Sequence, residues 1–567
     1  MQPVLSIKGL TVRFSSKEDS VSAVDNLHLE IKPGELHALV GESGSGKSIT
    51  ALSILKLLPN VGISLEGGIC FTGNDRVIEI LTADEEVLRS LRGNRIAMVF
   101  QEPMTSLNPL MNCGEQVAEN LRNHYQTSKA DAKEKVLSLF EKVKLPAPEV
   151  VYGKYPHQLS GGQKQRVMIA IAMVCNPTLL ICDEPTTALD VTVQKSILEL
   201  IRQLQLENNM AVLFISHDLG VVADIADSIT VMYKGKAVEQ GPASTVLTEP
   251  SHPYTKALLA CRPSMHNKGE RLPVVADFLK EESCVTKQEP QLFVPNSNDH
   301  KILEVKNLRV SYPVGNSLFG KTGKWYHAVQ DVSFYVKEGE TLGLVGESGC
   351  GKTTLGRCVL GLIKPSAGEV LYKQHNIHTH SAERFRMLRK EMQLIFQDPY
   401  SSLDPRQPIG KAIEEPLIVH NIYPGAGVRK DKVVELLEKV NLPADYYHRY
   451  PHQLSGGQRQ RIVIARALAL EPSFIVCDES VSALDVSVQA QVLNLLNELK
   501  TEFGFTAIFI SHDLAVVRYL SDRIMVMKAG RIEEEGAAEQ VYNHPASLYT
   551  RQLLAAIPGR TINSPRK

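Results

Sequence analysis

The stretch that decides the fold is GESGSGKS at residues 41–48, which returns as GESGCGKT at residues 346–353. The pattern GxxxxGK[S/T] is a phosphate-binding loop. Its glycines let the backbone wrap an anion, and the N–H groups at the start of the next helix point at the phosphates. Lys47 and Lys352 add a positive charge for the β- and γ-phosphates of a nucleotide. Because the pattern occurs twice, a chance glycine-rich turn does not explain it.

Each loop stands between a predicted strand and a predicted helix. The strands are the apolar runs at residues 35–40 and 340–345, and the helices are predicted over 49–58 and 354–362. Further short apolar runs alternate with helical segments in both halves of the chain. Such alternation predicts an α/β fold in which each domain has a mixed, mostly parallel sheet covered by helices.

The repeat extends far beyond the phosphate loop. FQEPMTSLNP at 100–109 returns as FQDPYSSLDP at 396–405, YPHQLSGGQKQR at 155–166 as YPHQLSGGQRQR at 450–461, CDEPTTALDVTVQ at 182–194 as CDESVSALDVSVQ at 477–489, and FISHDL at 214–219 as FISHDL at 509–514. A period this long indicates two whole domains rather than a solenoid. We expect a first domain at 1–262, a linker at 263–301 and a second domain at 302–567.

Composition excludes several classes of protein. The 567 residues carry a net charge of −1, so no general basic field favours nucleic-acid binding. The nine cysteines show no CxxC spacing, which argues against a zinc ribbon and favours a reducing, cytosolic compartment. The longest apolar run is the nine residues Val167–Cys175, whereas a membrane span needs about 20. The N-terminus lacks the pattern of a signal peptide.

Two buried strands are predicted to end in an Asp-Glu pair. In parallel α/β sheets ligands bind beyond the carboxyl ends of the strands, so these carboxylates are candidate site residues. Asp183 and Asp478 suit a role on Mg²⁺, and Glu184 and Glu479 suit polarising an attacking water. The alternative is an acidic pair that only caps a helix, which the order of the motifs disfavours.

The signature LSGGQ, at 159–163 and 454–458, completes the pattern. Its serine and glycines precede a helix and make a second anion-binding N-terminus in each domain. Together with the other blocks, it resembles two tandem nucleotide-binding domains of an ABC transporter, over about 500 residues. The resemblance implies an additional helical subdomain in each domain.

The resemblance also implies two ATP–Mg²⁺ sites, formed when the domains close head-to-tail, so that each signature serves the phosphate loop of the other domain. The catalytic residues it implies are Glu184, Glu479, His217, His512, Gln101 and Gln397. The nucleotide-binding residues it implies are Gly41, Ser43, Gly44, Ser45, Gly46, Lys47, Ser48, Ile49, Ser160, Gly161, Gly162, Gln163, Gly346, Ser348, Gly349, Cys350, Gly351, Lys352, Thr353, Thr354, Ser455, Gly456, Gly457 and Gln458. The Mg²⁺ ligands it implies are Ser48, Gln101, Asp183, Thr353, Gln397 and Asp478. Because every element is present twice, we expect two sites that both hydrolyse ATP.

The contact with adenine is less well defined by the sequence. Phe14 and Tyr312 lie near the start of each copy and are candidates for stacking, with core packing as the alternative reading. Trp325 and Tyr326 are rival candidates in the second copy. Cys350 lies within the second phosphate loop, and a helix N-terminus lowers the pKa of a thiol, which would make it reactive; a small residue that merely fits is the plainer reading.

The residues after each glutamine refine the family. EPMTSLNP and DPYSSLDP, with the tails SHPYTKALLA at 251–260 and HPASLYTRQLLAAIP at 544–558, resemble the importers of dipeptides, oligopeptides and nickel, including fused glutathione-type and microcin-type members. The resemblance implies two integral-membrane permease subunits, an extracytoplasmic solute-binding protein and a peripheral place on the cytoplasmic face of a bacterial inner membrane.

Some relatives carry an Fe–S cluster in the tail. Beyond Cys261 the linker has only Cys284 and the C-terminal tail has no cysteine, so no cluster is expected here. The alternatives are an exporter ATPase module and a ribosome-associated tandem ABC ATPase. The glutamine-block sequences disfavour the first. The second usually shows a long charged connector and a basic excess, which are absent.

Overall fold

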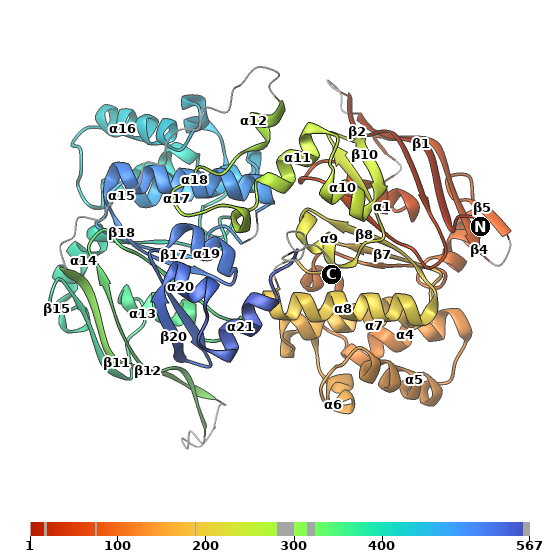
Figure 1. Ribbon diagram of the computed structural model, residues 1–567, viewed down its shortest axis with the longest axis horizontal. Coiled ribbons are helices and arrows are strands. Elements are labelled where there is room, and N and C mark those ends of the chain that lie inside the picture. The colour runs from red at the N-terminus through yellow and green to blue at the C-terminus, as the bar shows by residue number, and fades with distance from the viewer. Residues whose placement is uncertain are drawn as a thin grey trace. The chain divides into compact units, whose positions relative to one another are not determined.

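The computed structural model describes residues 2–15, 20–59, 61–73, 76–187, 189–279, 300–314, 324–482 and 484–559. The chain divides into two compact units. The first takes in Met1–Leu189, Val193–Leu259 and Pro558–Lys567, and the second takes in Asp190–Thr192 and Ala260–Ile557. Each unit contains one copy of the repeat (Figure 1). Most of the predicted linker, including Cys284, lies outside the described residues. The boundaries at 262 and 301 therefore remain a prediction.

The main sheet of the first unit is parallel except at one edge. Its order is β10-β9-β3-β8-β7-β6, and only β10 runs antiparallel to its neighbour. The strands are β3 (Leu36–Val40), β6 (Ile96–Val99), β7 (Leu179–Asp183), β8 (Ala211–Ser216), β9 (Ser228–Tyr233) and β10 (Lys236–Pro242). Every residue of β3, β7 and β8 is buried, as expected for parallel strands covered on both faces.

A second, antiparallel sheet was not foreseen from the sequence. Its order is β2-β1-β4-β5, built from β1 (Leu5–Ser15), β2 (Ser20–Ile31), β4 (Ile63–Gly73) and β5 (Arg76–Glu79). The inner faces of these strands share one hydrophobic core with the main sheet and with the first helix, through residues such as Leu10, Leu29 and Leu39. The outer face is exposed, so burial alternates along β2, and β-bulges break that alternation in β1.

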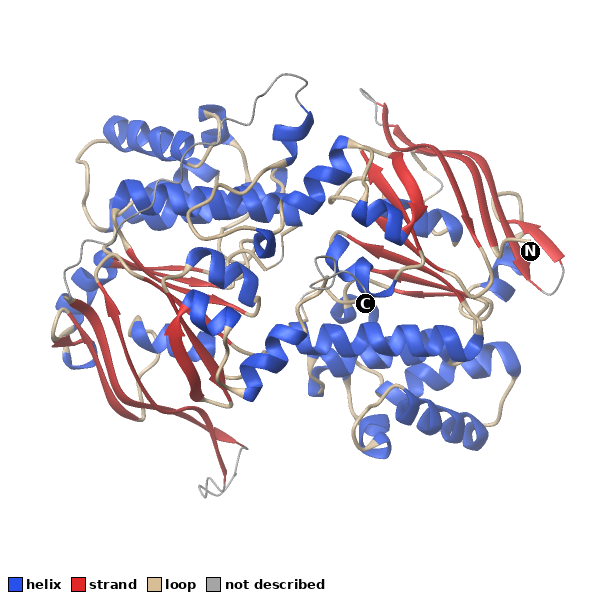
Figure 2. Cartoon of the chain, viewed as in Figure 1, coloured by secondary structure: helices blue, strands red, loops and turns tan. Residues whose placement is uncertain are grey.

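Helices cover the main sheet and form a separate group after β6 (Figure 2). They are α1 (Lys47–Ile54), α2 (Glu85–Leu91), α3 (Pro103–Ser106), α4 (Cys113–Tyr125), α5 (Lys129–Lys142), α6 (Pro148–Gly153), η1 (Pro156–Gln158), α7 (Gly161–Met173), α8 (Val191–Asn208), α9 (Leu219–Ile225), α10 (Ala243–Thr248) and α11 (Pro253–Ala260). Helices α4 to α7 pack on one another and form the expected helical subdomain.

The second unit repeats this plan. Its main sheet has the order β16-β17-β18-β13-β19-β20 and its antiparallel sheet the order β12-β11-β14-β15. The strands are β11 (Lys301–Val314), β12 (Lys324–Lys337), β13 (Thr341–Val345), β14 (Ala367–Tyr372), β15 (His375–Asn376), β16 (Met392–Ile395), β17 (Phe474–Asp478), β18 (Thr506–Ser511), β19 (Arg523–Lys528) and β20 (Arg531–Ala537).

The helices of the second unit begin with two short ones from the expected linker. They are η2 (Pro263–Met265), α12 (Val275–Leu279), α13 (Lys352–Val359), η3 (Ile377–Thr379), α14 (Ala382–Glu391), α15 (Ile409–Val419), α16 (Ala426–Lys439), η4 (Ala444–His448), η5 (Pro451–Gln453), α17 (Gly456–Leu468), α18 (Val486–Phe503), α19 (Leu514–Leu520), α20 (Ala538–Asn543) and α21 (Leu548–Ala555). The part of the expected linker that is described packs within this unit, where Lys268 pairs with Asp522.

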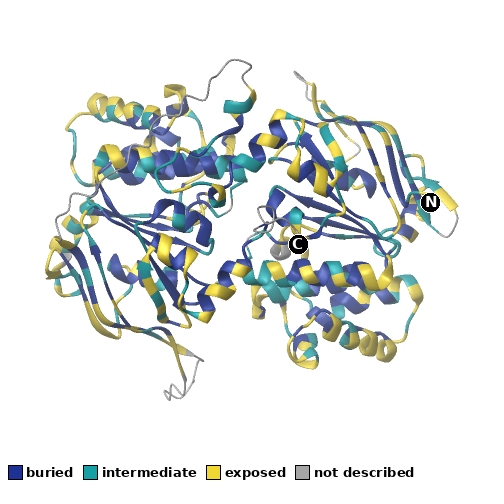
Figure 3. Ribbon diagram, in the orientation of Figure 1, coloured by how far each residue is buried: buried dark blue, intermediate teal, exposed yellow. Residues whose placement is uncertain are grey.

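These observations confirm the predicted fold class: two α/β domains, each with a mostly parallel sheet and a helical subdomain. The predicted strand at 35–40 is β3, whereas the helix predicted over 49–58 begins two residues earlier and ends at Ile54. The buried residues of each unit lie along its sheets and the facing sides of its helices (Figure 3). Among the described helices, none has the length and apolar character that would let it cross a bilayer.

Candidate nucleotide-binding and hydrolysis sites

Each phosphate loop follows the central strand of its main sheet and opens a helix. Lys47 is buried, and its ammonium donates to the carbonyls of Gly41 at 2.8 Å and Glu42 at 2.9 Å. Lys352 makes the same pair of contacts in the second loop, at 2.7 and 3.0 Å. Both ammonium groups are therefore folded over their own loop, where a phosphate would sit.

Glycine is required where each loop meets the neighbouring strand. Gly46 has a φ of 101°, and a Cβ there would lie 2.4 Å from the carbonyl oxygen of Ala23. Gly351 has a φ of 109°, and its Cβ would lie 2.2 Å from the carbonyl oxygen of Ala328. Any side chain would push the loop away from the strand that supports it.

The loop hydroxyl and the strand aspartate meet in both units. Ser48 Oγ donates to Asp183 Oδ1 at 3.0 Å, and Thr353 Oγ1 donates to Asp478 Oδ1 at the same distance. Both aspartates are buried, and that burial raises the pKa of each carboxyl group. A hydroxyl next to a carboxylate is the set of hard oxygen ligands that Mg²⁺ prefers, so the residues present fit this ion.

Glu184 has a left-handed backbone with a φ of 46°, which its N–H stabilises by bonding to the carbonyl of Ile215 at 3.1 Å. Its Oε2 accepts from Gln101 at 3.2 Å and from Thr187 at 3.0 Å, and lies 3.0 Å from His217 Nδ1. Burial acts to raise the pKa of Glu184, but the bond from His217 and the charge on Lys47 outweigh it and the pKa is lowered. The carboxylate is therefore ionised and able to act as a base.

The second unit holds its glutamate differently. Glu479 Oε2 accepts from Gln397 at 2.9 Å and lies 3.6 Å from His512 Nδ1, while Oε1 lies 3.8 Å from Lys352 Nζ. Ser482, which stands where the first copy has Thr187, donates instead to the backbone carbonyl of Glu479 at 3.0 Å. Thr187 could not be identified from the sequence alone, because its contact with Glu184 depends on side-chain rotamers.

The signature serines cap their helices. Ser160 Oγ accepts from the N–H of Gln163 at 3.4 Å, and the Gln163 side chain accepts from the N–H of Ser160 at 3.2 Å. Ser455 and Gln458 form the same capping box in the second unit. Both serines are exposed, so each helix presents its N-terminal end to its surroundings.

The aromatic residues that are candidates for stacking on adenine have different surroundings in the structure. Phe14 is half-buried and packs against the core of the first unit. Tyr312 pairs with Tyr326 across β11 and β12. The hydroxyl of Tyr326 donates a hydrogen bond to the carbonyl of Gly349 in the phosphate loop, at 3.1 Å. The rival candidate Trp325 is half-exposed on the same hairpin.

The burial of Cys350 favours the plainer of its two readings from the sequence, a small residue that fits. Its side chain is buried, and this burial raises the pKa of the thiol despite the nearby Lys352. The helix N-terminus therefore does not produce a reactive thiolate here. The Cys350 sulfur fills the space beside Gly346, where a Cβ would lie only 2.7 Å from it.

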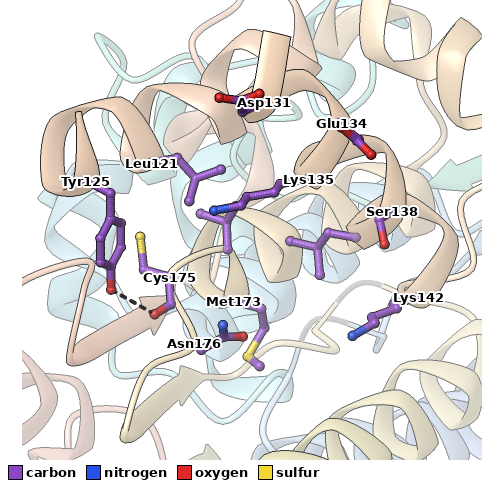
Figure 4. A pocket seen from close by; sticks show the side chains of 12 residues that line it. Leu121, Tyr125, Asp131, Glu134, Lys135, Ser138, Lys142, Met173, Cys175 and Asn176 are labelled. Atoms are coloured by element: carbon purple, nitrogen blue, oxygen red, sulfur yellow. Dashed lines mark hydrogen bonds between the residues drawn. The ribbon is translucent and has the colours of Figure 1, made fainter. Parts of the chain in front are cut away.

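A cavity of about 710 Å³ lies elsewhere in the first unit, on the helical subdomain (Figure 4). Helices α4 and α5 and the end of α7 line it, and Tyr125 donates to the carbonyl of Cys175 at its edge, at 3.5 Å. None of its lining residues belongs to a nucleotide motif, so this cavity is separate from the hydrolysis site.

The geometry defines a P-loop ATPase with a complete set of nucleotide motifs in each of two domains. The ABC transporter family model matches residues 24–187 and 329–482, and the model of the C-terminal region of oligopeptide/dipeptide transporters matches residues 238–282. The chain belongs to the ABC transporter family, and it is an ATP-binding subunit with ATPase activity.

Curated relatives match along almost the whole chain. The glutathione import ATP-binding protein GsiA of Salmonella choleraesuis is 46% identical, over 98% of this chain and 89% of the relative. The proteins of the same name from Pectobacterium atrosepticum and Escherichia coli show the same identity and coverage. Among solved structures, the ATP-binding cassette MJ0796, bound to ADP and Pi, is 31% identical over 42% of this chain and 98% of its own, with a TM-score of 0.38.

Proposed function

We propose that this chain is the energy-coupling subunit of an importer for glutathione or small peptides. The observation that carries the proposal is that both units hold the same group: a lysine folded over its loop, a Ser/Thr–Asp pair, and a glutamate next to a glutamine and a histidine. The family supplies the class of activity, and the relatives named for glutathione import support the cargo.

In the proposed reaction, Glu184 and Glu479 accept a proton from the attacking water. Gln101 and His217 contact the same carboxylate oxygen of Glu184, and Gln397 and His512 contact the same oxygen of Glu479. Ser48 with Asp183, and Thr353 with Asp478, would hold Mg²⁺, which when bound neutralises phosphate charge. Lys47 and Lys352 bind the phosphates, and each signature acts on the nucleotide held by the other domain.

The regions around the two glutamines are proposed to dock the membrane permease subunits. Large apolar side chains are exposed there: Phe100 and Leu110 in the first unit, and Phe396 and Tyr400 in the second. Tyr400 is held in place by Arg459, whose guanidinium lies 3.7 Å from its ring centroid. Exposed apolar groups next to the glutamine would let a partner sense the state of the nucleotide site.

The proposed location is the cytoplasmic face of a bacterial inner membrane, as a peripheral subunit that works with two permease subunits and a solute-binding protein. The test is to purify the tagged chain from detergent-solubilised membranes, identify what copurifies, and measure ATP hydrolysis in the reconstituted complex. Two permease subunits should copurify, and binding protein loaded with glutathione should stimulate hydrolysis more than unloaded binding protein. Recovery with ribosomes and without membrane subunits would contradict the proposal. If only dipeptides stimulated ATP hydrolysis, the proposed cargo would be wrong, but the assignment to the importer class would still hold.

A further inference from the structure

The helix at the end of each copy makes direct contact with the phosphate loop. Tyr254 lies on α11, and its hydroxyl accepts from the backbone N–H of Glu42 at 3.0 Å. Tyr549 lies on α21, and its hydroxyl accepts from the backbone N–H of Glu347 at 3.2 Å. Glu42 and Glu347 are the second residues of the two phosphate loops. The same contact has therefore formed twice, across more than 200 residues of chain each time.

Each tail is fixed to the last strand of its main sheet by a carboxylate. Glu239 on β10 accepts from the N–H groups of Ser251 at 2.7 Å and His252 at 3.1 Å, immediately before α11. Glu534 on β20 accepts from Ala546 at 2.7 Å and Ser547 at 3.0 Å, immediately before α21. These bonds determine where the helix begins and therefore where the tyrosine points.

The tyrosine rings are enclosed. Tyr254 is 0% exposed and lies against the ring of Tyr233, with 4.4 Å between the ring centroids. Tyr549 is 5% exposed, and Lys528 lies over its ring at 4.6 Å. A ring packed this tightly has few rotamers, so its hydroxyl is a fixed acceptor for the loop N–H.

The contact matters because the same peptide group is held from its other side by the lysine of the loop. The N–H of Glu42 shares its peptide group with the carbonyl of Gly41, to which Lys47 donates. The N–H of Glu347 shares its peptide group with the carbonyl of Gly346, to which Lys352 donates. If the lysine turns to the phosphates, it gives up that bond, and the bond from the N–H to the tyrosine still holds the entrance of the loop. The tyrosine would thus keep the loop in its binding shape when its own lysine no longer does.

We propose that Tyr254 and Tyr549 are positioning residues through which the two tail helices set the affinity of the phosphate loops for ATP. This inference rests on the proposed phosphate-binding role of the loops, and it assigns a role to the segment matched by the oligopeptide/dipeptide transporter C-terminal region, 238–282. Movement of α11 or α21 by a partner would then change nucleotide affinity without touching the loop.

The experiment measures equilibrium binding of ATP with Mg²⁺, together with kcat and KM for hydrolysis, in the full chain carrying Tyr254→Phe, Tyr549→Phe or both. Loss of one hydrogen bond predicts that each single variant weakens ATP binding and raises KM about 3–10-fold, with kcat within about twofold. Tyr233→Phe is the matched control, because its ring belongs to the same pair while its hydroxyl makes no hydrogen bond with loop residues 41–48, all of which the structure describes. It should behave as the parent.

Three results would overturn the proposal: unchanged ATP affinity in both tyrosine variants, an equal loss in the Tyr233→Phe control, or a fall in kcat at constant KM. If Tyr254→Phe does not fold, Glu239→Gln loosens the tail without changing the tyrosine and should raise KM in the same direction. Lys47→Ala and Lys352→Ala distinguish a failure of the proposed phosphate-binding role of the loops from a failure of the proposed role of the tyrosines. If they retain full ATP affinity, the proposed role of the loops fails. If they lose affinity while the tyrosine variants do not, only the role of the tyrosines fails.

Discussion

The side-chain amide of Asn494 forms two hydrogen bonds with the backbone of Leu272. Its Nδ2 donates to the Leu272 carbonyl at 2.8 Å, and its Oδ1 accepts from the Leu272 N–H at 2.9 Å. Leu272 is fully buried, and Tyr519 adds a bond to the carbonyl of Glu270 at 2.7 Å. A segment that follows the first copy in the sequence is thereby built into the second unit, against α18 and α19.

Asn494→Leu should destabilise the second unit by about 2–4 kcal/mol, because it leaves the N–H and carbonyl of Leu272 buried without their partner. Urea unfolding followed by a probe in that unit measures the loss. Glu199→Leu is the control: it changes the corresponding position of α8, which is exposed, and should alter stability by less than about 0.5 kcal/mol. Equal effects of the two changes would show that the bond to Leu272 contributes nothing specific.

Glu184→Gln and Glu479→Gln should each reduce ATP hydrolysis by more than half. Loss of a general base costs about 10²–10⁴-fold at its own site, and two sites that must complete one cycle together cannot compensate for each other. Steady-state hydrolysis in the assembled complex measures this, with ATP binding as the control, since Lys47 and Lys352 remain. Full activity in either variant would show that its site does not contribute to turnover.

Thr187→Val should slow hydrolysis at the first site with little change in KM. The variant keeps the shape of the side chain but removes the hydroxyl that donates to Glu184 Oε2 at 3.0 Å, so the carboxylate is held less firmly. We expect kcat to fall about tenfold, because the two sites complete one cycle together.

Thr187→Ser should restore most of that loss, because it restores the hydroxyl. Ser482→Ala is the matched variant of the second copy, where the hydroxyl bonds only to a backbone carbonyl, and it should leave kcat unchanged. An equal fall in Ser482→Ala would show that the whole loop, rather than the Thr187 hydroxyl, matters.

Glu35 should make the first unit sensitive to acid. Burial acts to raise its pKa, but bonds from His37, Ser228 and the N–H of Lys32 lower the pKa to about 2. A carboxylate whose folded pKa is depressed stabilises the protein above its unfolded pKa, and the stabilisation is lost as the pH falls from about 4.5 towards 2. Since the group is partly exposed, we expect about 1–2 kcal/mol.

The comparison of the parent chain with Glu35→Gln at pH 7 and pH 3 tests this. The variant should be less stable at pH 7, and the gap between the two proteins in urea midpoint should narrow at pH 3. A gap that is the same at both pH values would show that the bonds to Glu35 do not depend on its charge.

Much of the candidate site could be predicted from the sequence, because its residues lie in short motifs with local geometry. A glycine-rich turn between a strand and a helix positions Lys47 and Ser48 within eight residues, and a buried strand delivers Asp183 and Glu184 to the sheet edge. Which residue stacks on adenine stays a prediction, whereas the bond from Tyr326 to the phosphate loop depends on tertiary structure. Tyr326 reaches Gly349 only because β12 pairs with β11 in a register that aligns it with Tyr312.

The sequence by itself determined the two α/β domains, the phosphate loops, the Asp-Glu strands and the signature helices, since each depends on residues close together in the chain. Only the tertiary structure decided the antiparallel sheet beside each main sheet and the burial of Cys350. It also decided the contacts of Tyr254 and Tyr549 with the phosphate loops and the hydrogen bonds between Asn494 and Leu272. The two tyrosine contacts and the bond between Asn494 and Leu272 each join residues that lie 202 to 222 positions apart in the sequence. At such separations no periodicity or spacing links the partners; packing of the sheets and helices brings them together.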